Sequence, residues 1–219
     1  ERDVIISKGR GYIFVHIPKT GGTSLALALE SRAMKDDLML GDTPKASKRR
    51  KRLSDAKTAG RLWKHSTLAD IEGLVPRDEI AQMFTFTMVR NPWDRIVSYY
   101  HWLRDQTFDH PAVVLASQVD FGSFLNAPFV QQSFQAAPYG FYVRDGLKQE
   151  RCKLFIRVEH FAQDAAPLFD HLGFNLTLPH KNTSNRRLDY REYYTVQTRN
   201  LVAGLCAEDI ARFGYRFDA

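Results

Sequence analysis

A short apolar run followed at once by two glycines is the feature that most constrains the fold of this chain. Residues Tyr12–Ile17 are rich in β-branched and aromatic side chains and predict a buried strand. Residues Pro18–Ser24 supply a Gly-Gly turn and hydroxyl groups, and the run from Leu25 to Leu29 predicts a helix. A strand, a tight glycine loop and a helix direct backbone N–H groups at an anion, usually phosphate. Because Lys19 adds a positive charge there, the sequence predicts a nucleotide-phosphate site; the alternative is a strand–turn–helix with ordinary turn glycines.

The rest of the chain alternates predicted strands and helices. Further strands are predicted at 83–89 and 153–158, and helices over about 23–34, from Asn91 onward, and over about 160–172 and 190–213. Asn91 is the expected N-cap and Pro92 the first helical residue, and Thr67-x-x-Asp70 resembles a capping box that opens a short helix. This alternation predicts an α/β fold with a P-loop-type, mostly parallel sheet flanked by helices, in a single domain over 1–219.

Composition fits this fold and restricts the partners. The hydrophobic content of 44% and the charged content of 26% are those of an ordinary globular protein. A formal net charge of +6 suits an anionic ligand, nucleic acid or an acidic surface. Cys152 and Cys206 have no metal-ligand spacing and are expected to be buried free thiols. No apolar run approaches the roughly 20 residues that cross a bilayer.

A second cluster of anion-binding side chains follows the strand predicted at 83–89. Arg90 stands at the strand end, and Ser98 lies about two turns into the next helix. A guanidinium can donate two parallel hydrogen bonds to one phosphate, and a hydroxyl can donate to the same group. Arg90 alone fits a strand-end ion pair and Ser98 alone a solvent-facing helix residue. Together, downstream of Lys19, they predict a second phosphate pocket.

These segments resemble one enzyme family. His16–Ser24 closely resembles the 5′-phosphosulfate loop of sulfotransferases, in particular the branch of membrane-anchored carbohydrate sulfotransferases and their smaller bacterial relatives. Its lysine precedes the glycine pair, whereas the nucleoside-triphosphatase fingerprint places it after the second glycine. The segment 86–100 resembles the family's 3′-phosphate site, with Arg90 and Ser98 at the matching positions. The loop 182–187 resembles the donor-covering loop, and the resemblance extends to the closing segment 209–217.

The resemblance implies the sulfotransferase fold and a 3′-phosphoadenosine 5′-phosphosulfate (PAPS)-dependent enzyme that needs no metal. The product of this co-substrate is 3′-phosphoadenosine 5′-phosphate (PAP). The expected catalytic residues are Lys19 and His65, the latter a general base in the interval between the two phosphate motifs. His101, Asp70 and Glu72 are weaker alternatives as the base. The expected donor-binding residues are Pro18, Lys19, Thr20, Gly21, Gly22, Thr23, Ser24, Arg90, Ser98, Thr183, Ser184 and Arg186 (or Arg187).

The resemblance also implies a carbohydrate or glycolipid acceptor. Sugar contacts are expected from Gln131, Gln132, Gln135, Tyr139 and Tyr142. The basic run 45–52 either draws an anionic acceptor to the site or, as charge runs usually do, forms a solvated loop. No nucleic-acid partner is expected. The small size predicts a bacterial-type cytoplasmic enzyme, with a clipped lumenal domain as the alternative.

Two other function classes compete with sulfuryl transfer. A phosphate-loop kinase would need a Mg²⁺-binding carboxylate at a strand end. Neither the strand at 83–89 nor that at 153–158 ends in one, and Glu159 is the nearest candidate. A non-catalytic nucleotide- or nucleic-acid-binding module would use the net positive charge and ignore a 3′-phosphate, and its binding would weaken steeply with salt. Selectivity among adenine nucleotides separates these alternatives.

Overall fold

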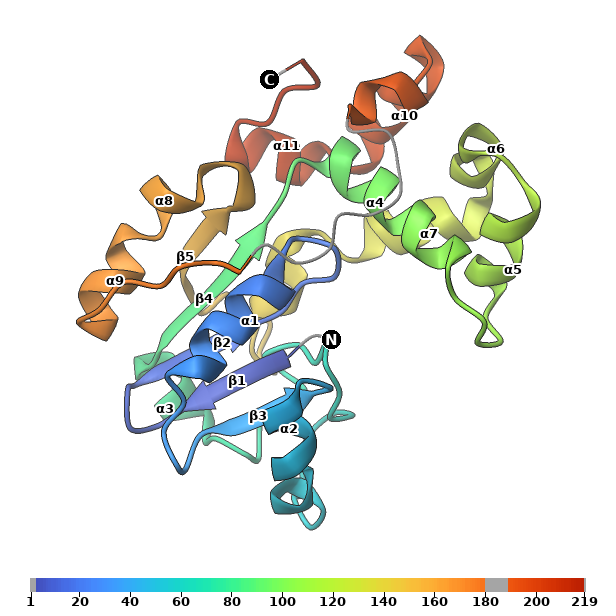
Figure 1. Cartoon of the computed structure of the whole chain (residues 1–219). Coiled ribbons are helices and arrows are strands. Elements are labelled where there is room, and N and C mark those ends of the chain that lie inside the picture. The colour runs from blue at the N-terminus through green and yellow to red at the C-terminus, as the bar shows by residue number, and fades with distance from the viewer. Residues whose placement is uncertain (1–2, 180–188, 219) are drawn as a thin grey trace. The chain divides into compact units, whose positions relative to one another are not determined.

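A computed structural model describes residues 3–179 and 189–218 of the chain (Figure 1). The chain forms two compact units. Unit 1 comprises Glu1–Val89 and Tyr139–Lys181, and unit 2 comprises Arg90–Pro138 and Asn182–Ala219. The single-domain organisation therefore stays a prediction.

The described part of unit 1 is built on a five-stranded sheet with strand order β3-β1-β2-β4-β5. Its strands are β1 (Asp3–Ser7), β2 (Tyr12–Val15), β3 (Leu38–Gly41), β4 (Phe84–Val89) and β5 (Cys152–Arg157). The pairs β2–β4 and β4–β5 are parallel, as predicted. The sequence analysis missed β1 and β3, and β1 is antiparallel to both β2 and β3. The strands other than β1 therefore run in one direction, and their carboxyl ends share one edge of the sheet.

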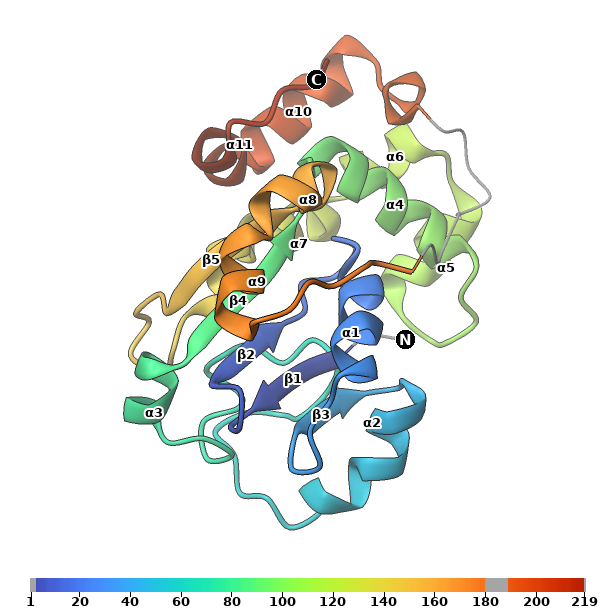
Figure 2. The ribbon, with the colours of Figure 1, turned by 60° about the vertical axis from the view of Figure 1, so that its left-hand side comes forward.

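The two faces of this sheet bury alternate residues of each strand, as the period of two requires. On one face, Tyr12 and Phe14 pack in a cluster with side chains of α1, α2, α8 and α9. On the other face, Ile13 and Val15 pack against the segment 68–83 and Val143. The helices of unit 1 are α1 (Gly22–Ser31), α2 (Pro44–Arg49), α3 (Arg77–Gln82), α8 (Phe161–Asp164) and α9 (Ala166–Leu172), and α1 lies across the sheet in Figures 1 and 2.

Three local predictions for unit 1 need correction. The basic run 45–52 is not a solvated loop: it forms α2 and the 3-10 helix η1 (Arg50–Leu53). Arg49 and Arg52 in this run donate to backbone carbonyls at 34–37, which fixes part of the charge in place. Thr67 and Asp70 exchange the hydrogen bonds of a capping box but open turns rather than a helix. The helix predicted over 160–172 is divided into α8 and α9 at Ala165, two residues before Pro167.

Unit 2 is helical in its described residues. Its helices are α4 (Pro92–Arg104), α5 (Pro111–Gln118), α6 (Phe121–Asn126), α7 (Pro128–Ala136), α10 (Val196–Leu205) and α11 (Ala207–Phe213). The start of α4 is as predicted, since the Asn91 side chain accepts from the Trp93 N–H at 3.1 Å. The core of this unit joins α4 to α5, α6 and α10. Among the helices that the structure describes, none is long and apolar enough to span a bilayer.

Candidate functional site

The loop between β2 and α1 has the geometry that the sequence predicts for an anion site. It begins at the carboxyl end of β2, where His16 and Ile17 are buried, and it ends where α1 begins at Gly22. Lys19 has φ of 65° and Gly21 has φ of 83°, so two residues of this loop are left-handed. For a non-glycine residue this conformation costs about 1–2 kcal/mol. The strain at Lys19 indicates that the loop holds this residue in a specific orientation.

Hydroxyl groups of the loop differ in what they contribute. The Thr20 hydroxyl donates to the Ile17 carbonyl at 2.9 Å and is fully buried, so this side chain braces the loop from below. Gly21 caps α1 without a side chain, and the first turn carries no acidic residue. The first N–H groups of a helix have no acceptor within the helix and carry the positive end of its dipole. The Ser24 N–H already donates to the Gly21 carbonyl at 3.2 Å, so the stretch from Gly21 to Thr23 is the part suited to an anion.

Gly22 is required by the imidazole beneath the loop. A Cβ at this position would lie 2.5 Å from His16 Cδ2. We therefore expect Gly22→Ala to lower the free energy of unfolding by about 1–3 kcal/mol, as overpacking of a core does. The matched control is Gly204→Ala in α10, where a Cβ would meet nothing within 4 Å. This substitution is expected to stabilise the helix by about 0.5–1 kcal/mol. Chemical denaturation measures both; equal effects would show that His16 does not constrain this glycine.

His65 lies directly beside this loop, although it comes from a distant and irregular part of unit 1. It is 5% exposed, and its Nδ1 lies 3.1 Å from the His16 carbonyl oxygen. Because a carbonyl only accepts, Nδ1 carries the hydrogen, and in the neutral ring Nε2 holds the lone pair. The ring also contacts the His16 and Trp63 rings edge-on, at 5.2 and 5.1 Å between centroids. The structure therefore fixes the orientation and tautomer of this imidazole.

The other candidate bases are occupied elsewhere. Asp70 accepts from the Thr67 N–H and hydroxyl. Glu72 pairs with Arg77 at 2.7 Å, and hydrogen bonding from this guanidinium lowers the pKa of the carboxyl. A carboxylate with a lowered pKa is a weaker base. His101 lies on α4 in unit 2, in contact with the Tyr100 and Tyr193 rings. Within unit 1, His65 is the candidate that lies against the loop.

Arg90 and Ser98 belong to unit 2, at the start and in the second turn of α4. The Arg90 guanidinium pairs with Asp94, one helical turn on, at 2.7 Å from Nε and 2.6 Å from Nη2. Sequence analysis missed Asp94 as the partner, although the four-residue spacing signals it. A guanidinium has five N–H donors, so this pair engages one edge of the fork. Ser98 is 7% exposed, which corrects the solvent-facing alternative for this residue.

The remaining predicted site residues divide into two groups. Thr183, Ser184, Arg186 and Arg187 lie outside the described residues. Among the expected sugar contacts, Tyr139 is fully buried, and the Gln131 amide donates to the Leu125 carbonyl at 3.0 Å. Neither cysteine forms a disulfide; Cys206 is buried, as predicted, whereas Cys152 is only partly buried. Burial raises the pKa of the Cys206 thiol to about 12. Residues 3–179 and 189–218 hold no group of three or more metal-ligating side chains.

Comparisons with known proteins identify the fold and the family of the chain. The model of the sulfotransferase family matches residues 2–127, more than half of the chain. The structure is similar to that of mouse sulfotransferase SULT7A1 complexed with PAP, with a TM-score of 0.54 and 18% sequence identity. This similarity covers 91% of the chain and 84% of the mouse protein. No curated protein matches the chain. The fold is that of a sulfotransferase, and the chain belongs to the sulfotransferase family.

Proposed function

We propose that this protein transfers the sulfuryl group of PAPS to a hydroxyl of a carbohydrate acceptor, with His65 as general base. The observation that carries the proposal is the loop of unit 1, where the strained Lys19, the left-handed Gly21 and the start of α1 adjoin an oriented imidazole. The family match supports the choice of donor, as does the complex of the mouse sulfotransferase with PAP. A glycolipid is the related alternative as acceptor.

In the proposed reaction the acceptor oxygen attacks sulfur as the bond from sulfur to the bridging phosphate oxygen breaks. The acceptor proton passes to Nε2 of His65, and the electron pair of the broken bond stays on the 5′-phosphate of PAP. Lys19 and the N–H groups at the start of α1 stabilise the charge that grows on the leaving oxygens. Their contribution is positioning and electrostatic, as it is in phosphoryl transfer.

Arg90 and Ser98 are assigned to the 3′-phosphate of the donor. Arg90 follows Val89, the last residue of β4, and β4 runs parallel to the β2 strand that precedes the loop. The Asp94 carboxylate pairs with the Arg90 guanidinium and orients this side chain, and a guanidinium can bind a phosphate through two parallel N–H donors. Charge-assisted hydrogen bonds of this kind contribute about 1.5–3 kcal/mol each.

Titration calorimetry with PAP, 5′-AMP and ATP tests this assignment. We expect the wild-type protein to prefer PAP, and Arg90→Ala to weaken PAP binding by about 10- to 100-fold with little effect on 5′-AMP. Arg90→Lys is the matched control: it retains the charge but loses the fork, so an intermediate affinity is expected. Equal or tighter binding of ATP would overturn the proposal in favour of a kinase.

A further inference from the structure

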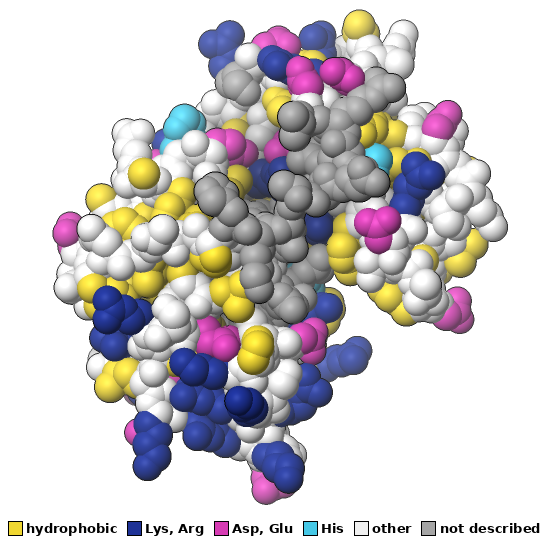
Figure 3. Space-filling view, in the orientation of Figure 1, with side chains coloured by type: hydrophobic (Ala, Val, Ile, Leu, Met, Phe, Trp, Pro, Cys, Tyr) yellow, Lys and Arg dark blue, Asp and Glu magenta, His cyan; other side chains and the backbone are white. Residues whose placement is uncertain are grey.

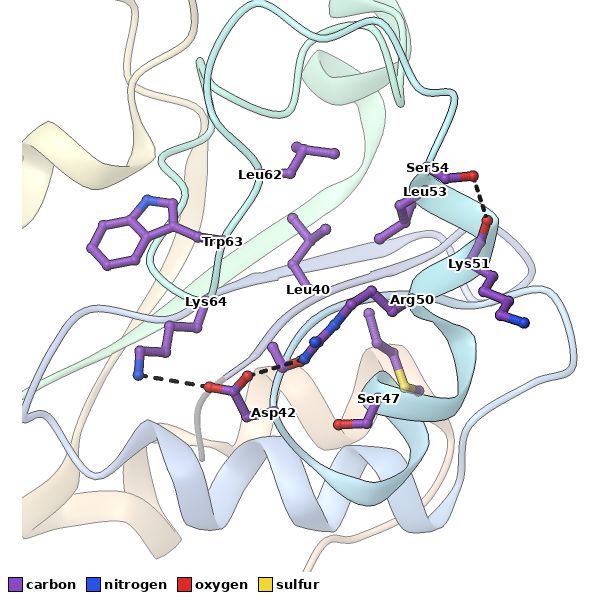
Figure 4. Close-up of a pocket in the computed structure, with 12 residues that line it drawn as sticks. Leu40, Asp42, Ser47, Arg50, Lys51, Leu53, Ser54, Leu62, Trp63 and Lys64 are labelled. Atoms are coloured by element: carbon purple, nitrogen blue, oxygen red, sulfur yellow. Dashed lines mark hydrogen bonds and ion pairs between the residues drawn. The ribbon is translucent and has the colours of Figure 1, made fainter.

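A cavity in unit 1 is used by none of the roles assigned above. Its volume is about 710 Å³, within the range of small-molecule sites. Its walls come from the end of β3, from α2 and η1, and from the segment 62–64 (Figure 4). Lys and Arg side chains also gather on the surface around α2 (Figure 3). The cavity thus combines the size of a ligand site with a basic surrounding.

The lining has two chemical parts. Leu40, Leu53 and Leu62 converge on an apolar floor in Figure 4. Trp63 follows Leu62 in the chain, and in Figure 4 its indole extends away from these leucines; 45% of its surface is exposed, which is high for so large an apolar side chain. The Asp42 carboxylate forms ion pairs with Arg50 Nη2 at 3.2 Å and with Lys64 Nζ at 3.6 Å. The site therefore offers an aromatic and apolar surface beside two cations, and its ligand should have an apolar face and a negative charge.

The cations are available to a ligand at small cost. The side chains of Arg50, Asp42 and Lys64 are 66%, 51% and 29% exposed. Ion pairs this exposed contribute at most about 1 kcal/mol, so a ligand anion can replace Asp42 as their partner. The backbone of Trp63 is held more firmly, because its amide N–H donates to the buried Ser66 hydroxyl, which itself lies 2.9 Å from the Arg61 carbonyl. The indole ring contacts the His65 ring edge-on, so the segment that carries the aromatic surface is anchored, and the charges around it are adjustable.

The cavity adjoins the candidate base. Trp63 lines the cavity and also contacts His65, which is bonded to the His16 carbonyl beside the loop. In the sheet, Ile5 pairs with both Phe14 and Met39. The positions two residues further on are His16 and Gly41, which are therefore about two strand spacings, or about 10 Å, apart. The cavity and the loop thus lie at the same edge of the sheet, with His65 between them.

We propose that this cavity is the acceptor subsite and that it binds an acidic sugar unit adjacent to the unit that is sulfated. The C–H face of the sugar ring packs on Trp63, and its carboxylate or ester sulfate binds Arg50 and Lys64. The neighbouring unit then presents its hydroxyl to Nε2 of His65. This inference rests on the proposed function and specifies its acceptor as an anionic oligosaccharide.

Calorimetry with oligosaccharides of defined charge tests the subsite. The probes are hexamers of galacturonate, mannuronate and hyaluronan, each compared with its carboxyl-reduced, neutral form, with and without PAP on the full chain. We expect at least one acidic hexamer to bind about tenfold more tightly than its reduced form. Arg50→Gln, Lys64→Gln and Trp63→Ala should each weaken that binding several-fold. Lys48→Gln removes the same charge from α2 outside the cavity and should have little effect.

Several results would overturn the subsite. One is the absence of any preference for acid over reduced hexamers. Another is an equal loss in Lys48→Gln and Lys64→Gln, which would indicate attraction by net charge alone. Tighter binding of octyl glucoside, independent of Arg50 and Lys64, would show that the leucine floor takes an alkyl chain. The PAP affinity is a separate readout: its absence would overturn the donor assignment, whereas the Lys64→Gln comparison would still decide the subsite.

Discussion

Replacing Lys19 with alanine is expected to lower kcat by about 10²–10³, the usual cost of removing a group that stabilises charge in the transition state. The reason is the position of Lys19 in the loop that follows β2, two residues before the left-handed Gly21. Its ammonium is assigned to the bridging and leaving oxygens, where charge grows as the S–O bond breaks. PAP affinity should fall much less than kcat, because this interaction strengthens only in the transition state.

The substitution Lys19→Gly distinguishes the effect of losing the ammonium group from the effect of backbone strain at this position. Lys19 has φ of 65°, which glycine adopts without steric cost and alanine does not. Lys19→Gly and Lys19→Ala should therefore lose similar activity, while the glycine variant unfolds at the same or higher denaturant concentration. Rate measurements with PAPS and a sulfatable oligosaccharide, together with denaturation, give both quantities. Activity retained in Lys19→Gly but lost in Lys19→Ala would mean that the loop conformation, rather than the charge, is what catalysis needs.

The parallel centre of the sheet was predictable because its strands are apolar runs with clear borders. β2 ends in a glycine loop and β4 ends at an Asn-Pro helix start, and both signals are local. β3 was missed because Leu38–Gly41 is four residues long and lacks β-branched side chains. Its strand conformation depends on pairing with β1, which no local pattern reports. The conformation of β3 is therefore set by tertiary contacts.

In the candidate site, too, some parts follow from local sequence and others depend on tertiary contacts. The residues of the loop follow one another in the sequence, so their motif could be recognised directly. The orientation of His65 depends on a bond to His16, which is 49 positions away in the chain. The cavity depends on Asp42 and Lys64, which are also distant in sequence and meet through a 3.6 Å ion pair. Sequence analysis could name His65 from its interval between two motifs, but its tautomer and its neighbour Trp63 required the structure.

Replacing His65 with asparagine should lower kcat by about 10²–10⁴, the range that general-base catalysis contributes. An asparagine amide nitrogen occupies nearly the position of Nδ1, so it can still donate to the His16 carbonyl, as Nδ1 does at 3.1 Å. The variant therefore keeps the buried hydrogen bond and loses the lone pair at Nε2, together with the edge contacts of the ring to His16 and Trp63. Its stability and its PAP affinity should stay close to those of the wild-type protein. His65→Gln places the amide near the position of Nε2, gives up the bond to His16, and should lose stability as well as activity.

The pH profile distinguishes a base from a positioning residue. A protonated imidazole has no lone pair with which to accept the proton of the acceptor hydroxyl. The wild-type kcat should therefore fall as the pH is lowered, and the residual rate of His65→Asn should not show that fall. If His65 only held the His16 carbonyl and Trp63 in place, His65→Asn would retain the acid limb and most of the rate. Such a result would move the search for the base to His101, and the Trp63 cavity would then have to be judged by its binding data alone.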